Sequence, residues 1–182
     1  MEFIPTDIPG CLEIRPQVHE DERGLFIKIF HAPNFHVRGL ALEFGEEYYS
    51  VSRKGVLRGL HFHLPPQEHA KLLYCAAGSV LDAVVDLRRG SPTFGKHLIV
   101  ELGPRNRTAL YLPPGLAHGF YATSAEALMV YKTTTPYSPK HDAGLRWDSC
   151  GIPWPDPSPI LSSRDRDFPT MERFESPFSF KA

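Results

Sequence analysis

The sequence predicts an all-β domain, an antiparallel sandwich or barrel, and three observations support this. Apolar and polar residues alternate with a period of two in many short segments, as in strands that bury one face. Turns rich in proline and glycine separate these segments at short intervals, which favours antiparallel strands over alternating strand and helix units. Only one segment, 33–40, has a helical pattern, and internal repeats are absent.

The segment 79–87 is the clearest example of a predicted strand. Ala83 and Val85 share one parity and Asp82 and Asp86 the other, which predicts a half-buried strand with the aspartates facing outward. The same reasoning predicts strands in the remaining period-two segments, which are 24–30, 46–53, 56–63, 70–76, 97–102, 108–112, 118–123 and 126–133.

The chain length of 182 residues is suited to one domain, 1–182, without a linker. After Trp147 the sequence becomes rich in proline and charge and loses its periodicity. We therefore expect the segment from about 147 to 182 to be an extended or short-helical tail on the barrel. Trp154, Ile160 and Leu161 are the expected anchors of this tail.

Composition limits the partners of the protein. A formal net charge of -1 gives no electrostatic reason to expect nucleic acid or a membrane surface, so a small-molecule partner is expected. The sequence has no membrane-length apolar stretch and no signal-peptide pattern, which predicts a cytoplasmic protein. Cys11, Cys75 and Cys150 are odd in number and widely spaced, so we expect reduced cysteines without a catalytic role.

The segment RGLHFHLPPQEHAKLL, residues 58–73, concentrates polar chemistry within apolar strands. On an extended strand His61 and His63 lie on the same face, so both imidazoles can point into one interior. Lys71 shares parity with Leu73 and Cys75 on the next predicted strand and can point into the same cavity. A lysine inside a barrel requires a polar partner or a ligand.

Two further segments add polar side chains. PPGLAHGFY places His118 at the start of a strand, and in MVYKTTTPY the parity of Tyr131 is that of Met129 and Ala127. Alone, a barrel histidine or tyrosine is most often a hydrogen-bonded core residue. Together, these groups favour a site that binds something polar. Four arginines are instead expected to be solvated turn residues: Arg88, Arg89, Arg105 and Arg107.

A series of motifs spans nearly the whole chain in order. They are DERGLF, VLRGLHFH with AKL, VDLRRGSPTFG, LYLPPGLAHGF, VYK, GLRWD, GIPWP and ILSSRD. This series resembles the dTDP-4-dehydrorhamnose 3,5-epimerase family. The resemblance implies a cupin-type jelly-roll β-barrel and catalysis without a metal or organic cofactor. It also implies a homodimer in which an N-terminal segment of one subunit completes the site of the other.

The resemblance implies roles for individual residues. His61 matches the general base, and Asp165 matches the carboxylate that orients it. Asp167, two residues further on, is the alternative match for this carboxylate. Lys71 matches the lysine near the developing enolate, and Tyr131 matches the acid on the opposite face. The residues matching substrate contacts are Arg23, Phe26, Arg58, His118, Tyr137 and Arg164.

The implied reaction requires the same residue types. A ketone at carbon 4 of a 6-deoxy sugar acidifies the hydrogens on carbon 3 and carbon 5, but the enolate must be stabilised in the site, which a lysine can do. A histidine is a neutral base near pH 7, and a carboxylate on its other nitrogen determines the tautomer. Inversion requires a proton from the other face, which a phenol can supply. The expected substrate is a nucleotide-diphosphate 4-keto-6-deoxy-hexose, inverted at carbon 3, carbon 5 or both.

Several nucleotide-contacting positions depart from the family pattern. Lys28 replaces a glutamate, Glu46 a glutamine, Tyr48 an asparagine, and Lys140 another glutamate. These changes alter charge and shape while the catalytic positions remain intact. We therefore hypothesise that the reaction type is kept and the nucleotide part altered, with dTDP, CDP, GDP and UDP open.

Two alternative functions remain open from the sequence. His63 replaces the family's usual glutamine, so His61, His63, Glu68 and His118 resemble the ligand set of metal-dependent cupins. Lys71 nearby would oppose a bound cation. The second alternative is a non-catalytic sugar-nucleotide binder, which would need neither a base nor an opposed acid.

Overall fold

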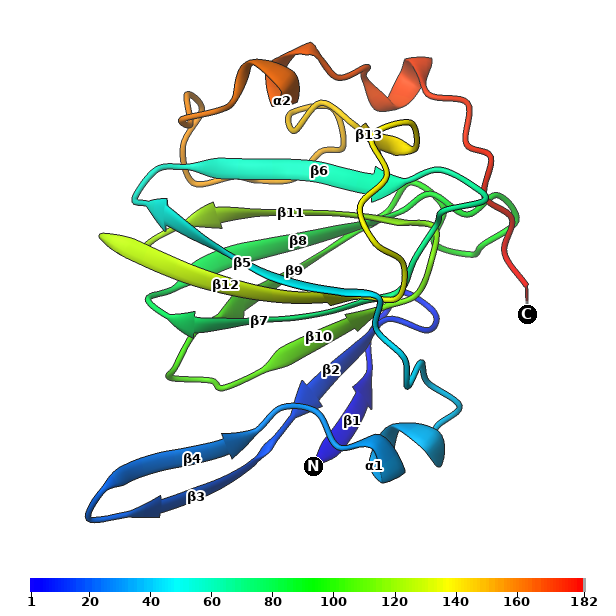
Figure 1. Cartoon of the computed structure of the whole chain (residues 1–182). Helices are drawn as coiled ribbons and strands as arrows, with labels where there is room; N and C mark the ends of the chain where they lie inside the picture. The colour runs from blue at the N-terminus through cyan, green and yellow to red at the C-terminus, as the bar shows by residue number, and fades with distance from the viewer. Residues whose placement is uncertain (182) are drawn as a thin grey trace.

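Two antiparallel β-sheets face each other and enclose the core of the protein in a jelly-roll barrel (Figure 1). The computed structural model describes residues 1–181. The six-stranded sheet contains, in spatial order, β1 (Glu2–Pro5), β2 (Leu12–Arg15), β10 (Ala109–Leu112), β7 (Lys71–Ala77), β12 (Glu126–Thr133) and β5 (Glu46–Arg53). The five-stranded sheet contains β13 (Asp142–Gly144), β6 (Leu57–His63), β11 (Leu116–Ala122), β8 (Val80–Asp86) and β9 (His97–Leu102). The predicted all-β jelly roll is confirmed.

A β-hairpin near the N-terminus projects from the barrel as an arm. It consists of β3 (Gln17–Asp21) and β4 (Gly24–Lys28), which pair only with each other (Figure 1). The predicted strand 24–30 corresponds to β4, whereas β1, β2, β3 and β13 were not predicted. These four strands are short, three to five residues each, and their alternation is therefore weak.

The helical segments are short. The helix α1 (Ala32–His36) confirms the start of the predicted segment 33–40 and ends earlier than predicted. The turn that follows contains Gly39 with a φ of +66°, a left-handed conformation that favours glycine and ends a helix. Two further one-turn segments lie in the C-terminal tail, α2 (Ser163–Asp167) and the 3-10 turn Met171–Arg173.

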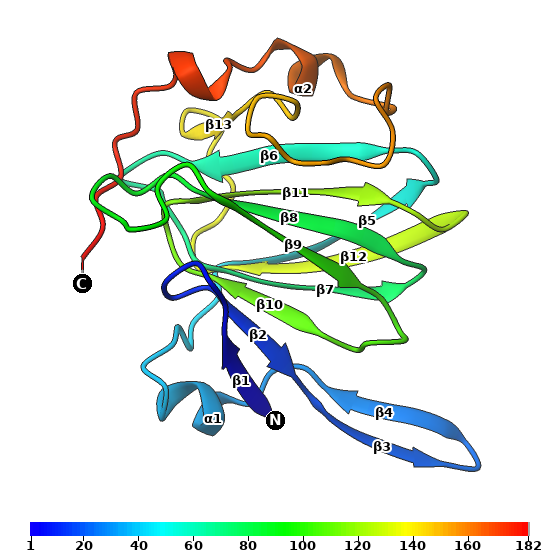
Figure 2. The same ribbon diagram turned by 180° about the vertical axis from the view of Figure 1, so that it is seen from behind.

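The predicted faces of β8 are reversed in the structure. Val80 and Val84 belong to the core cluster inside the barrel. Asp82 lies on the same face of the strand and is fully buried. Ala83 and Val85 instead pack on the outer side of the sheet. That outer side is covered by the tail, whose Ile152, Trp154, Met171, Phe174 and Phe178 join the same cluster (Figures 1 and 2). The prediction of outward aspartates was wrong because alternation cannot reveal that the tail covers the apolar face.

The tail is anchored mainly by other residues than those predicted. Trp154 packs on the outer cluster and donates its indole N–H to the Trp147 carbonyl at 2.9 Å, as an anchor should. The Ile160 side chain is 58% exposed, and only its backbone holds the tail, through hydrogen bonds with Gly55 and Leu57.

Arg88 is a second correction. It was predicted to be a solvated turn residue, but its side chain is buried and forms an ion pair with Asp86 at 2.8 Å. Asp86 also accepts hydrogen bonds from Ser91 and Thr93 at 2.6 and 2.7 Å. This network joins the end of β8 to the following turn. Arg89 and Arg105 are exposed as predicted, and Arg107 is partly so.

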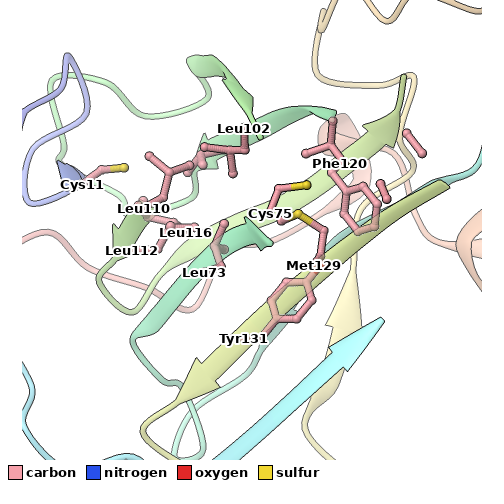
Figure 3. Close-up of a cluster of buried hydrophobic side chains, with 14 of the residues drawn as sticks. Cys11, Leu73, Cys75, Leu102, Leu110, Leu112, Leu116, Phe120, Met129 and Tyr131 are labelled. Atoms are coloured by element: carbon pink, nitrogen blue, oxygen red, sulfur yellow. The ribbon is translucent and has the colours of Figure 1, made fainter. Parts of the chain in front are cut away.

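The interior of the barrel is apolar at one end and changes character toward the other. Figure 3 shows leucines from several strands packed with Cys75 and Met129, and Tyr131 at the edge of this cluster. Among residues 1–181, no helix has the length and apolar character that crossing a membrane requires.

Candidate active site

His61 on β6 and Asp165 on α2 form a hydrogen-bonded pair at one mouth of the barrel. His61 Nε2 lies 2.8 Å from Asp165 Oδ1, and the carboxylate is almost completely buried. An ionised carboxylate only accepts hydrogen bonds, so Nε2 carries the proton of the neutral imidazole. The lone pair of His61 is therefore on Nδ1, where it can accept a proton.

Local structure explains how Asp165 reaches β6. Ser162 caps α2, and its Oγ accepts a hydrogen bond from the Asp165 N–H at 3.1 Å. The other carboxylate oxygen of Asp165 accepts the Gly59 N–H at 3.3 Å. A Cβ at Gly59 would lie 2.6 Å from the Gly119 Cα, so the close approach of β6 and β11 requires glycine here.

Opposing effects act on the pKa values of this pair. Burial lowers the pKa of His61, the hydrogen bond and charge of Asp165 raise it, and Lys71 and Arg164 lower it, with a lowered pKa as the result. Burial raises the pKa of Asp165, but hydrogen bonds from His61 and Gly59 outweigh it and hold that pKa below its usual value. At neutral pH the pair is thus a neutral imidazole beside an ionised carboxylate, as a general base requires.

Lys71 lies at the start of β7 with its side chain buried, as predicted from its parity. Its Nζ donates a hydrogen bond to the His61 carbonyl oxygen at 3.2 Å. Burial lowers the pKa of Lys71 to about 8, although Asp142 and Asp82 raise it. The side chain is therefore mostly an ammonium at pH 7, and it places a positive charge beside the base.

His118 on β11 pairs with Asp82 on β8, a contact that the sequence did not predict. His118 Nε2 lies 2.7 Å from Asp82 Oδ2, and both side chains are buried. The second carboxylate oxygen of Asp82 is buried without a hydrogen-bond partner. The only sequence signal was a pair of aspartates in the strongly apolar segment VLDAVVDL, which could have indicated an interior carboxylate.

Tyr131 on β12 completes the interior set. Its ring is almost completely buried, stacked on the Tyr48 ring at 4.9 Å and edge-on to His118 at 5.9 Å. Burial, Asp82 and Tyr48 raise the pKa of Tyr131 well above its usual value. The phenol is therefore protonated at neutral pH and can donate a proton.

Two adjoining cavities bring these side chains together. An inner cavity of about 170 Å³ is lined by Tyr48, Ser50, Arg58, His61, Lys71, His118, Phe120 and Tyr131. An outer cavity of about 310 Å³ is lined by Glu46, Tyr48, His61, Phe62, His63, His69, Lys71, Thr133, Tyr137, Asp142 and Arg164. His61, Lys71 and Tyr48 line both. The predicted base, lysine, acid and barrel histidine thus converge on the inner cavity.

Several predicted substrate contacts lie around the outer cavity. Glu46 accepts the Tyr137 backbone N–H at 2.7 Å, and the Tyr137 hydroxyl donates to Asp142 at 3.2 Å. Arg164 pairs with Asp142, and its Nη2 lies 3.0 Å from His61 Nε2. Arg58 instead lines the inner cavity, and its Nε donates a hydrogen bond to Ser52 at 2.9 Å. Asp142 was missed by sequence reasoning because its strand, β13, is only three residues long.

Three predicted contacts are not brought to the site within one chain. Arg23, Phe26 and Lys28 belong to the arm, and neither cavity includes them. Arg23 pairs with Asp21, and Phe26 is 61% exposed. Figure 1 shows that the arm extends away from the barrel.

The metal-ligand alternative lacks its geometry. His61 Nε2 and His118 Nε2 are each bonded to a carboxylate, and His63 packs instead against His69 at 4.4 Å between ring centroids. Glu68 does not line either cavity. Within residues 1–181 no three histidine, cysteine, aspartate or glutamate side chains form a group that could hold a metal ion.

The cysteines are free and buried. Burial raises the pKa of Cys11 to about 12 and that of Cys75 to about 11, and it also raises that of Cys150. A raised pKa disfavours the thiolate, so none of these thiols has the environment of a nucleophile.

The inner cavity of this jelly-roll barrel brings together a neutral histidine with its carboxylate, a buried ammonium and a buried phenol. These groups define an acid–base enzyme for a small polar substrate. The family model described as dTDP-4-dehydrorhamnose 3,5-epimerase matches residues 5–173. The chain belongs to this epimerase family.

Relatives and solved structures agree. The dTDP-4-dehydrorhamnose 3,5-epimerase of Shigella flexneri is 44% identical over 168 residues, which cover 91% of this chain and 93% of the relative. The crystal structure of the 3,5-epimerase RmlC from Legionella pneumophila, in complex with dTDP-4-keto-L-rhamnose, has a TM-score of 0.93 and 35% identity, covering 100% of this chain and 99% of that chain. The structure of ChmJ, a 3'-monoepimerase from Streptomyces bikiniensis in complex with dTDP-quinovose, has a TM-score of 0.88 and 35% identity, covering 92% and 87%.

Proposed function

We propose that this protein inverts ring carbons next to the ketone of a nucleotide-linked 4-keto-6-deoxy sugar. The observation that carries the proposal is the convergence of His61, Lys71 and Tyr131 on one inner cavity. His61 Nδ1 removes the proton from carbon 3 or carbon 5, and the electrons of that C–H bond form the enolate at carbon 4. Asp165 holds the imidazole in the tautomer that leaves Nδ1 free and stabilises the imidazolium.

Lys71 and Tyr131 complete the reaction. The Lys71 ammonium stabilises the negative charge that develops on the carbon 4 oxygen. The Tyr131 hydroxyl gives its proton to the same carbon from the face opposite His61, which inverts the centre. The tyrosinate then regains a proton, and the imidazolium loses one, so the site returns to its starting state. His118 with Asp82 contributes a hydrogen bond to the bound sugar.

Whether one or both carbons invert is part of the test. Incubation of the protein with a 4-keto-6-deoxy sugar nucleotide in heavy water should place deuterium at the carbons that it deprotonates. We expect label at carbon 3, carbon 5 or both, and the labelled position identifies the centres. A folded protein that gives no label with any nucleotide tested would be the non-catalytic binder, and the proposal would be wrong.

The nucleotide is the second part of the proposal. The names of relatives and the solved complexes refer to dTDP sugars. In this chain Glu46 and Tyr48 line the outer cavity, and Lys28 is on the arm, where the family pattern has other residue types. We propose that the outer cavity, beside Arg58 and Arg164, holds the nucleotide and that these changes alter its preference. Titration with dTDP, CDP, GDP and UDP tests this, and clear preference for dTDP would refute the altered preference.

The third part is a homodimer in which the arm of one subunit reaches the outer cavity of the other. Support comes from the arm itself, since Leu25 and Phe26 are exposed apolar residues on a hairpin that packs on no other sheet. In its partner's site, Arg23 would face the phosphates and Phe26 the nucleoside.

The cytoplasmic location of the protein also stays a prediction.

Mixed dimers test the exchanged arm. Arg23→Ala and His61→Ala should each remove activity from a homodimer. In a heterodimer of the two, one site combines intact His61 with intact Arg23, and a random mixture should recover about a quarter of the wild-type sites. Recovery would require contributions from both subunits. No recovery in mixed dimers of confirmed composition would show that the arm serves its own chain.

A further inference from the structure

The aromatic stack between Tyr48 and Tyr131 has a geometry that restrains the proposed acid. The two residues are direct cross-strand partners of β5 and β12, and their rings are nearly parallel, 4.9 Å apart with an interplanar angle of 16°. Such offset stacks are a favoured arrangement of aromatic rings. The asparagine that the family pattern has at position 48 could not form this stack.

Tyr48 separates the buried acid from the open mouth of the site. It lines both cavities, whereas Tyr131 lines only the inner one. The exposed fraction is 42% for Tyr48 and 6% for Tyr131. Removal of the Tyr48 ring would therefore open space on the outer side of Tyr131.

A second aromatic ring also contacts Tyr131. His118 is edge-on to the Tyr131 ring, with 5.9 Å between centroids and an interplanar angle of 73°. Asp82 holds that imidazole through a buried hydrogen bond. Contacts with both Tyr48 and His118 restrict the rotamers open to the buried Tyr131 ring.

We propose that Tyr48 is a positioning residue that keeps the Tyr131 hydroxyl directed into the inner cavity, so that protonation by Tyr131 outcompetes return of the proton from His61. This inference rests on the proposed function. The enolate has two fates. If the Tyr131 O–H bond breaks and its proton joins the carbon, the centre is inverted and a tyrosinate remains. If the His61 imidazolium returns a proton instead, the original configuration is restored.

The ratio of the two fates can be measured in heavy water. An imidazolium that exchanges with solvent before it returns its proton leaves deuterium in uninverted substrate, whereas Tyr131 gives inverted product. In Tyr48→Asn we expect the ratio of deuterated, uninverted substrate to inverted product to rise about 10-fold, which corresponds to the upper range of aromatic pair energies. A variant that is only partly unfolded would form less deuterated substrate and less inverted product in the same proportion, so their ratio would not change.

Three further variants sharpen the test. Tyr48→Phe keeps the ring and should restore the wild-type ratio. Tyr48→Leu fills part of the space without a flat ring and should behave as Tyr48→Asn does. Tyr49→Asn makes the same change one residue further on, at a side chain that is 69% exposed, and should keep the wild-type ratio.

The outcomes separate this inference from the proposed function. If the wild-type protein exchanges and inverts, and folded Tyr48→Asn and Tyr48→Leu keep the wild-type ratio, the positioning role is wrong and the proposed function stands. If the wild-type protein incorporates no deuterium, the proposed function is wrong and this inference with it.

Discussion

Asp82 and His118 form a buried hydrogen bond of 2.7 Å inside the barrel, from neighbouring strands that pair in register. Burial raises the pKa of Asp82 itself, although His118 and Lys71 lower it, and the charge of the ionised carboxylate raises the pKa values of Lys71 and Tyr131. One interior carboxylate thus influences three side chains of the proposed site.

Asp82→Asn should therefore move the pH profile as well as lower activity. Removal of the negative charge lowers the pKa of Lys71, so the ammonium is lost at lower pH. We expect the alkaline limb of kcat/KM to move to lower pH and kcat to fall about 10-fold or more. An unchanged alkaline limb in a folded variant would show that Asp82 does not act on Lys71.

Asp86 lies on the same strand and provides a structural contrast. Asp86→Asn leaves Arg88 buried without its carboxylate partner, which should lower the free energy of unfolding by about 3 kcal/mol. Burial raises the pKa of Asp86, but hydrogen bonds from Arg88, Ser91 and Thr93 outweigh it and lower that pKa. Its contribution to stability is thus complete above the unfolded pKa and is lost as pH falls through the folded pKa. Urea unfolding at neutral and acidic pH would measure this difference, while the pH profile of activity should keep its wild-type shape.

Asp165→Asn tests the partner of the base. Asp165 raises the pKa of His61, so its neutralisation should lower that pKa further. We expect kcat to fall about 100-fold or more, because no carboxylate then holds the tautomer of His61 or stabilises its imidazolium. The acid limb of kcat/KM should move to lower pH. An acid limb that moves to higher pH would contradict the assignment of the pair.

Lys71→Met should abolish activity and increase the stability of the folded protein. The pKa of Lys71 is lowered to about 8, and below that pH the folded protein bears the cost of a buried ammonium. The unfolded chain binds more protons between pH 8 and the ordinary lysine pKa, so wild-type stability rises with pH in that range. Methionine of similar shape should raise the free energy of unfolding at pH 7 by up to about 3 kcal/mol.

Activity measurements complete this test. Lys71→Met should incorporate no deuterium from heavy water, because the enolate lacks its cation. Thermal unfolding at pH 7 should give a higher midpoint than the wild-type protein. A folded variant that still exchanges would remove Lys71 from the mechanism.

Tyr131→Phe should separate exchange from inversion. His61 remains intact, so deuterium should still enter the substrate with its configuration retained. Inverted product should fall about 100-fold or more, since general acid catalysis has been removed. NMR of the recovered sugar distinguishes the two configurations, and inversion at the wild-type rate would assign the acid to another group.

The sequence by itself determined the architecture and most of the inner cavity. Period-two alternation predicted the central strands, and parity placed Lys71 and Tyr131 on interior faces, because side chains alternate strictly along a strand. The ordered motifs pointed to the family and to His61 with Asp165. These features depend on local geometry or on residue identity, which the sequence contains.

Only the tertiary structure decided which faces are covered and which distant residues meet. The tail buries the outer face of β8, so Asp82 faces the interior and Asp86 pairs with Arg88, which reverses the faces predicted from alternation. The Tyr48 stack on Tyr131 depends on the register between β5 and β12. Such contacts join residues far apart in the chain, and the energy of burial depends on what packs above a face, which periodicity along one strand does not encode.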